Sequence, residues 1–526
     1  MYQLLICKTE KLYQQLEYRP NHTEIISKHL YQDNRHQIFQ LNQLISNQQS
    51  LTQSSYSLFN NVLSYSYRYN DEEAIFKRVL GKEIVINSNE NYTKLPLFFD
   101  HNYTIKIPKK VERLLRRYLP KSVLKEIDDD FEVAIELCLL MLTRLNSTYF
   151  ELRDDASFEG WKSLKAEFLR DFLSTGSLTY KKVREALEYP FSTGRIIECD
   201  YKAIEGEKCF NYRLGKSYIN KGFIKYQLKT NKAKELLDKS YLRTHKIACA
   251  NPICSNLIML YPRVTLPSLH EIEVEARKLV KNKFKTKKGK LLKFRGKHPN
   301  SYFKNPKQIS FVEDSIEIFK YLTENGLMIP IPGSDESGGR IVDSFTLMPS
   351  WIRSLVKIEG VPFVECDFTC LHPNIAISIY GGNTTFLKHQ DITDAMQLDP
   401  KTVKQEHLSF FNKPVWQMKQ SPLFDFYKKQ ESSMIDNIIF EKYNSKQKHK
   451  STSRKMFCKE VEIMKDVIQQ LNKLDIYVGY VYDALLCHPN HAFKVSEIMN
   501  STAIKYKINT TAKVSDPQIN NQLGRK

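Results

Sequence analysis

The segment DIYVGYVYDALLCHPNHAFKVSEIMN, Asp475 to Asn500, constrains the fold of this chain more than any other stretch. Two short apolar runs flank Tyr482 and Asp483, and a helical pattern starts after the second run. The pattern predicts an antiparallel hairpin with its bend at these two residues. Asp483 is the acid of an otherwise apolar hairpin, and a buried carboxylate needs a partner or a metal ion to offset its desolvation.

A second acid lies in a similar position far upstream. The segment VECDFTCLHPNIAISIYGG, Val364 to Gly382, predicts a short strand, then a helix that ends at the two glycines. Pro373 falls early in that helix, where its missing N–H costs little. Asp367 therefore lies at the end of a strand. Hard divalent cations prefer carboxylate oxygens, and two-metal phosphoryl chemistry needs carboxylates from neighbouring strands, a pairing that Asp367 and Asp483 can supply.

These two segments resemble motifs of known polymerases. DFTCLHPNI looks like motif A of palm polymerases, and YVYDALLCHP is similar to motif C of family A DNA polymerases and single-subunit phage-type RNA polymerases. The resemblance implies that Asp367 and Asp483 are the catalytic residues and hold two Mg²⁺ ions, with Mn²⁺ as an alternative. It covers roughly residues 335 to 510 and departs from family A after motif C, where Ala484 replaces an acid.

The resemblance also implies substrate-binding residues between and before these motifs. KTVKQEHLSFFNK, which starts at Lys401, resembles the motif B helix, and Lys404 is its best match to the cation that faces the triphosphate. Lys401 is a second candidate contact. GGRIVDSF, upstream of motif A, resembles the Gly-Arg segment of family A, so Arg340 is expected to touch the primer–template backbone or the substrate. For Lys404 and Arg340 the alternative is an ordinary surface cation.

Two further residues complete the expected site. His372 stands five residues after Asp367, where a bulky side chain in DNA-making palm enzymes excludes a ribose 2′-hydroxyl. Its alternative role is to cap the helix that follows. The helix RKMFCKEVEIMKDVIQQL resembles the one that leads into motif C, and Glu460 on it is expected to orient neighbouring groups.

The chain is strongly basic, with a formal net charge of +20. Such a surplus favours a polyanionic partner, with nucleic acid first and an anionic membrane surface second. The densest basic run, from Arg277 to His298, carries two interleaved phenylalanines and predicts phosphate contacts with aromatic stacking. A solvated helix or loop is the alternative. The predicted nucleic-acid contacts in this run are Lys283, Lys285, Lys287, Lys288, Lys290, Lys293 and Arg295.

The region before the basic run is predicted to be mainly helical. Apolar residues recur at three- and four-residue spacing between about residues 108 and 190. A short basic helix from Ser177 to Pro190 is followed by two predicted strands, Gly194 to Lys202 and Cys209 to Gly215. Helix, strand, turn, strand is the order of a winged helix and resembles the winged-helix modules of replication proteins. An unrelated helix followed by a hairpin fits the same pattern.

The expected fold class is α/β (α+β), and the resemblance implies a right-hand polymerase with an antiparallel palm sheet and helical fingers. We expect a poorly defined region over residues 1–105, a winged-helix-like nucleic-acid-binding region over 106–265, a basic linker or thumb-like segment over 266–335, and palm and fingers over 336–526. The ten cysteines lack paired CxxC spacing, which indicates reduced thiols rather than a zinc site. With no apolar run of about 18 residues and no signal peptide, a cytoplasmic, organellar or viral location is expected.

The function that follows is template-directed nucleotidyl transfer, most simply a DNA polymerase that extends a primer 3′-hydroxyl with nucleoside triphosphates on a DNA template. A compact enzyme with a winged helix fits replication of a phage or other mobile element. One alternative is a single-subunit RNA polymerase. Another is a DNA-binding replication initiator with an inactive palm. The sequence leaves the oligomeric state open.

Overall fold

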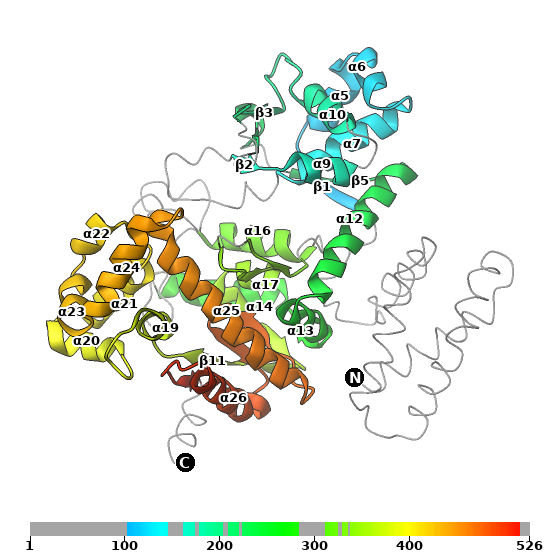
Figure 1. Cartoon of the computed structure of the whole chain (residues 1–526). Coiled ribbons are helices and arrows are strands. Elements are labelled where there is room, and N and C mark those ends of the chain that lie inside the picture. Colours follow the sequence, from blue (N-terminus) through cyan, green and yellow to red (C-terminus); the bar gives the residue numbers. More distant parts are fainter. Residues whose placement is uncertain are drawn as a thin grey trace, which may run out of the picture. The chain divides into compact units, whose positions relative to one another are not determined.

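The fold is described from a computed structural model of the chain (Figure 1). It describes residues 103–145, 161–173, 178–202, 209–219, 223–282, 311–324, 329–334 and 337–515, all within one unit that runs from Leu95 to Lys526. Helices and small antiparallel sheets make up this part of the chain, so the α/β (α+β) class is confirmed. The region predicted to be poorly defined lies almost wholly outside the described residues. None of the described helices is both long and apolar enough to span a lipid bilayer.

The first described elements form a helical region with its own core. β1 (Thr104–Pro108) pairs antiparallel with β5 (Phe223–Gln227), and between them come α5 (Val111–Tyr118), α6 (Lys121–Ile127) and α7 (Phe131–Thr143). The sequence of α7, FEVAIELCLLMLT, is apolar on nearly every side, which is the pattern of a buried helix. Its N-cap Asp130 accepts hydrogen bonds from the first turn. The apolar core around it joins residues from Ile105 to Leu237.

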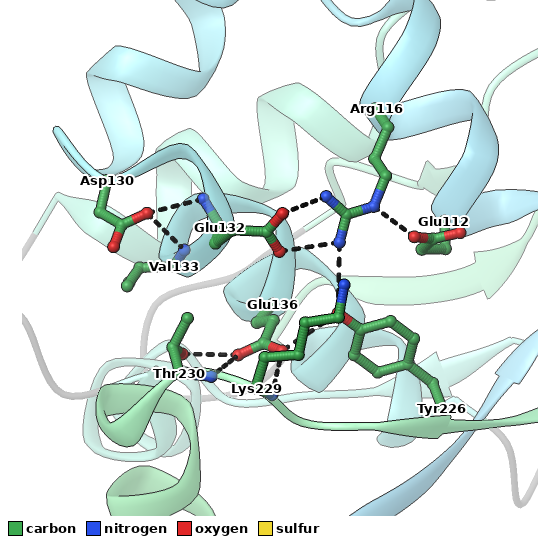
Figure 2. A network of polar contacts seen from close by, with 9 residues as sticks. All are labelled: Glu112, Arg116, Asp130, Glu132, Val133, Glu136, Tyr226, Lys229 and Thr230. Carbon is green, nitrogen blue, oxygen red and sulfur yellow. Dashed lines mark hydrogen bonds and ion pairs between the residues drawn. The ribbon is translucent and has the colours of Figure 1, made fainter.

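A buried carboxylate ties α7 to the start of α12 (Asn231–Cys249), as Figure 2 shows. Glu136 is fully buried and accepts hydrogen bonds from the backbone N–H groups of Lys229 (2.6 Å) and Thr230 (2.9 Å). The hydroxyls of Thr230 (2.5 Å) and Tyr226 (3.1 Å) donate to the same carboxylate. Four donors satisfy the charged group in place of water, which is the condition for burying it.

Replacing Glu136 by Ala should destabilise the protein by about 3 kcal/mol, because two backbone N–H groups and two hydroxyls lose their buried acceptor. Glu132 on the same helix is the matched control. It forms a two-pronged ion pair with Arg116 but is partly exposed, so its replacement by Ala should cost below about 1 kcal/mol. Urea unfolding midpoints of the two variants measure the difference. Equal losses would contradict the role assigned to Glu136.

A three-stranded sheet with two helices follows within this region. β2 (Lys162–Ser163), α9 (Ala166–Leu173), α10 (Thr179–Leu187), β3 (Ile197–Cys199) and β4 (Asn211–Leu214) occur in this chain order. The strands are antiparallel and lie in the order β2-β4-β3. The predicted basic helix and both predicted strands are therefore confirmed. The turn expected between the two strands lies mostly outside the described residues.

The middle of the chain connects the helical region to the C-terminal sheet. Its elements are α11 (Lys216–Ile219), α13 (Pro252–Leu260), η1 (Tyr261–Arg263), β6 (Val264–Thr265), α14 (Leu269–Lys281), α16 (Phe311–Glu324), β7 (Ile331–Pro332), β8 (Ile341–Val342), α17 (Ser344–Leu347), α18 (Ser350–Arg353), β9 (Lys357–Ile358) and β10 (Val361–Pro362). Asn256 of α13 fixes this segment on the C-terminal sheet. Its buried amide donates to the carbonyl of Val478 (2.7 Å) and accepts from the Val478 N–H (3.1 Å).

The C-terminal sheet has four antiparallel strands in the order β12-β13-β11-β14. The strands are β11 (Val364–Phe368), β12 (Gly479–Val481), β13 (Ala484–Cys487) and β14 (Ala512–Val514). α26 (Ala492–Lys505) packs on β11 and β14, and α19 (Leu371–Tyr380) continues from β11 and ends at Gly381 in the left-handed region. The predicted hairpin, its following helix and the strand–helix pair around Asp367 are all present.

A group of helices lies between α19 and the hairpin in the chain (Figure 1, yellow to orange). They are α20 (His389–Met396), α21 (Pro400–Phe410), α22 (Val415–Lys419), α23 (Leu423–Gln430), α24 (Ser432–Asn444) and η3 (Lys448–Lys450). The long helix α25 (Ser451–Asn472) follows and contacts α13, α19, α24 and α26. The helix expected at Lys401 to Lys413 is therefore α21, and the helix expected to lead into the hairpin is α25.

Candidate active site

Strand pairing brings the two predicted metal-binding segments together. Asp367 of β11 lies directly opposite Ala484 of β13, and the N–H of Phe368 donates to the carbonyl of Asp483 (3.4 Å). Neighbouring strands are about 4.8 Å apart, so the Cα atoms of Asp367 and Asp483 lie roughly 6 Å from each other. Two acids that are remote in the sequence thus lie close together, Asp367 on β11 and Asp483 in the bend that leads into β13.

The pleat of β11 sorts its residues between two faces. Val364, Cys366 and Phe368 are buried, whereas Glu365 and Asp367 are exposed. The Cys366 thiol lies 3.7 Å from the carbonyl of Ala492 in α26, so this helix covers the buried face. Asp367 consequently stands on the face of β11 that α26 leaves open.

Asp483 sits in the bend between β12 and β13. The preceding Tyr482 has φ 60°, in the left-handed region, which turns the chain sharply at this point. Burial raises the pKa of Asp483, and the negative charge of Glu460 raises it further. His372 and Arg340 act in the opposite direction. The charged form of this carboxylate is therefore disfavoured by its surroundings, and a nearby cation would stabilise it.

Glu460 of α25 is the centre of a buried polar cluster. It is fully buried and accepts hydrogen bonds from Arg340 at Nε (2.8 Å) and Nη2 (2.5 Å). The Nε2 of His372 lies 2.6 Å from the same carboxylate and 3.0 Å from Arg340 Nη2. Burial by itself raises the pKa of Glu460, but the hydrogen bonds from His372 and Arg340 outweigh it and hold that pKa below its usual range. The expectation that Glu460 orients neighbouring groups is confirmed.

Aromatic rings hold the Arg340 guanidinium from two directions. Its carbon lies 3.6 Å from the ring centre of Phe457 and 4.8 Å from that of Tyr482. Both are cation–π distances. Within the described part of the chain, Nη1 of Arg340 and Nδ1 of His372 have no protein partner. The cluster therefore presents one fixed donor, Nη1 of Arg340, close to Asp483, while its buried charges are paired.

The helix α21 brings a further cation near the start of α19. The charge of Lys404 acts on the Cys370 thiol and on the His389 ring, and the N–H of His389 donates to Cys370 Sγ (3.2 Å). On the same helix, burial and the neighbouring His389 lower the pKa of His407 to about 3. Lys404 thus lies near Cys370 and His389, where Asp391 and Lys513 also act on Cys370, and Lys401 is exposed one turn earlier.

The predicted site residues fall into three groups. The structure gathers Asp367, Asp483, Arg340 and His372 at one end of the C-terminal sheet, with Lys404 on the adjoining helix. Lys401 makes no contact with this group that the structure describes. The predicted basic contacts, Lys283, Lys285, Lys287, Lys288, Lys290, Lys293 and Arg295, lie outside the described residues.

The sequence analysis placed Tyr482 at the hairpin bend and named neither Tyr482 nor Phe457 as a site residue. Phe457 precedes Glu460 by three residues, so the two share a face of α25. That spacing was the available signal. Nothing local indicated that Arg340 would insert between Phe457 and the hairpin bend, because their contact joins segments far apart in the chain.

The carboxylates suit the expected ion. Mg²⁺ and Mn²⁺ take oxygen ligands, and Asp367 on β11 and Asp483 in the neighbouring bend offer carboxylate oxygens. The environment that disfavours the charge on Asp483 is one that a cation would compensate. In the described ranges, no three His, Cys, Asp or Glu side chains form a group that could hold a metal ion by themselves. The described cysteines are free thiols.

Comparison with known proteins adds no relative. No known protein family matches the chain, and no curated protein matches it either.

Proposed function

We propose that this chain is a template-directed nucleotidyltransferase, and specifically a DNA polymerase that extends a primer 3′-hydroxyl. One observation carries the proposal: β11 pairs with β13, so that Asp367 lies next to Asp483 in the bend before β13, beside a fixed Arg–Glu–His cluster. The order of strand with acid, basic helix, long helix and acid-bearing hairpin along the chain supports it.

Each residue of the site has a role in this proposal. Asp367 and Asp483 would hold Mg²⁺, which when bound activates the attacking hydroxyl and stabilises charge on the phosphate. Lys404 lies on α21, where it can neutralise the triphosphate of the incoming nucleotide. Arg340 Nη1 would donate to sugar or phosphate oxygens, and the His372 ring, held by Glu460, would pack against the sugar. In this assignment the β12-β13-β11-β14 sheet is the palm and α20 to α24 are the fingers.

The helical region supports a DNA partner. The order β2, α9, α10, β3, β4 and the sheet order β2-β4-β3 are those of a winged helix, with α7 as the helix that precedes the first strand. In such a module the second helix, here α10, faces the duplex and the β3–β4 hairpin lies along the backbone. We infer that this region binds template DNA outside the palm.

Primer extension tests the proposal directly. The purified protein, a primed DNA template, Mg²⁺ and either deoxy- or ribonucleotides should give extension with deoxynucleotides. Extension with ribonucleotides alone would instead establish the single-subunit RNA polymerase. Failure with both sets, together with tight duplex binding, would favour the replication initiator with an inactive palm. The winged-helix order and the alanine at position 484 are the observations behind that second candidate.

Replacing His372 by Ala should relax sugar selection. The ring is anchored by Glu460 and packs edge-on against Phe457, so in the wild type it cannot rotate freely out of the way. We expect ribonucleotide incorporation to rise by roughly 10- to 100-fold relative to deoxynucleotide incorporation, the range expected when one contact of about 1–3 kcal/mol is lost. The ratio of kcat/KM for the two nucleotide classes measures it. His491→Ala, on the same protein but in η4 (Pro489–His491), should leave the ratio unchanged.

A further inference from the structure

Two large aromatic side chains stand exposed on one helix of the proposed fingers. Phe440 and Tyr443 of α24 are 69% and 70% exposed. They are three residues apart, so both project from the same side of the helix. Both side chains keep most of their surface in water, and two such rings together mark an interaction surface rather than a core.

Unpaired lysines follow these rings directly. Lys446, Lys448 and Lys450 are exposed, and none forms an ion pair within the described part of the chain. By contrast, two lysines on either side are neutralised: Lys428 pairs with Asp436 (2.6 Å) and Lys455 with Glu441 (2.6 Å). The acids near the rings are therefore occupied, and the three lysines leave a net positive surface beside the aromatic pair.

A buried lysine makes this surface rigid. Lys442, between the two rings in sequence, points inward and donates to the carbonyls of Phe411 (2.8 Å), Lys413 (3.1 Å) and His449 (2.6 Å). These bonds tie the end of α24 to η3 and to the loop after α21. Burial lowers the pKa of Lys442 to about 8, but the three carbonyl acceptors still compensate its ammonium group. The rings and the three lysines are therefore displayed on a fixed backbone.

We propose that Phe440, Tyr443, Lys446, Lys448 and Lys450, hereafter the α24 strip, bind single-stranded nucleic acid. Rings on a rigid helix can stack on successive bases of any sequence, and the lysines beside them can contact the phosphates. A protein partner would need the apolar rings without the cationic border, whereas a nucleic-acid strand uses both. None of these five residues belongs to the proposed catalytic site, so this site goes beyond the proposed catalysis and does not depend on it.

Binding of a labelled oligo(dT) strand of about 20 nucleotides to the full-length protein tests the strip, in EDTA so that catalysis plays no part. Phe440→Ala with Tyr443→Ala should weaken binding by roughly tenfold or more, because each lost ring removes a stacked base. Lys446→Gln with Lys448→Gln and Lys450→Gln should reduce the salt dependence, log Kobs against log[salt], by about 2, since each phosphate contact contributes about 0.7 on single strands.

Control variants elsewhere on the chain distinguish binding by the α24 strip from the general effect of removing exposed lysines or apolar side chains. Lys473→Gln with Lys507→Gln removes exposed lysines elsewhere, and Ile504→Ala removes a 68% exposed apolar side chain; neither should change binding. Photocrosslinking of a halogenated oligonucleotide should label residues within 440–450.

Unchanged affinity and salt dependence in both strip variants would overturn the proposal. So would a loss of self-association without any change in oligonucleotide binding, which would identify a protein interface. An enzyme inactive in primer extension that still shows the strip-dependent binding would leave this site standing.

Discussion

Asp367→Asn should reduce nucleotide incorporation by at least about 10³-fold, while the protein stays folded and still binds DNA. Asparagine keeps the shape of the side chain but offers one neutral oxygen instead of a carboxylate, and it cannot supply the charge that a divalent cation needs. Asp367 is exposed on β11, so the substitution removes no core contact and the melting temperature should stay within the small range of surface changes.

Asp483→Asn should give the same catalytic loss with a different effect on stability. Burial and the charge of Glu460 disfavour the ionised carboxylate, so a neutral isostere should hold or raise the melting temperature. Loss of activity together with unchanged or greater stability is typical of a carboxylate kept for function. Single-turnover extension and thermal unfolding of the two variants measure both quantities.

Glu365→Gln is the matched control for these two substitutions. Glu365 lies two residues from Asp367, on the same strand and the same exposed face. If incorporation depends on Asp367 itself, Glu365→Gln should stay within about threefold of the wild type. Full activity in Asp367→Asn or Asp483→Asn would exclude the proposed metal-dependent transfer at this site.

Glu460→Leu should destabilise the protein by about 3–5 kcal/mol, the largest stability loss that we expect from a single substitution here. Removing the carboxylate leaves the Arg340 guanidinium, and His372 beside it, without their buried acceptor. Glu460→Gln, which retains one acceptor oxygen, should lose less. Both variants should also lose extension activity through displaced Arg340 and His372, because Glu460 acts as a positioning residue. Chemical unfolding and steady-state kinetics on the same preparations distinguish the two effects.

The stability that the Glu460 carboxylate contributes should decrease as the pH falls. The pKa of Glu460 in the folded protein lies below its ordinary value of 4.5, so the folded state favours the charged form. The stabilisation is fully present above pH ~4.5 and is lost as the pH falls through the folded pKa. The stability difference between wild type and Glu460→Gln should therefore be greatest near neutral pH and shrink below about pH 4.5.

Exposed Glu462 is the control on the same helix. It pairs with Lys459 at the surface, so Glu462→Gln should cost below about 1 kcal/mol at any pH. A Glu460→Gln protein as stable as the Glu462→Gln protein at neutral pH would show that the buried cluster does not hold Arg340 and His372 as described.

The spacing of apolar residues within short segments was sufficient to predict the strands and helices that carry the site. The alternation of VECDF, the helical sequence up to the two glycines, and the apolar runs around Tyr482 each involve neighbours within a few residues, where periodicity and turn chemistry operate. The same applies to α10 and to α25. β2 was not predicted because two residues of strand leave no periodic signal, although this strand establishes the sheet order β2-β4-β3.

By itself, the sequence determined the strand and helix around Asp367, the hairpin and helix around Asp483, and that Asp367 stands at a strand end and Asp483 at a hairpin bend. Only the tertiary structure decided that β11 lies beside β13, that Arg340 inserts between Phe457 and Tyr482, and that Glu460 pairs with both Arg340 and His372. Secondary structure follows from short-range sterics and hydrogen bonding, which a local window of residues contains. A buried ion pair depends on desolvation and on partners as much as 120 residues apart, and these exist only once the chain has packed.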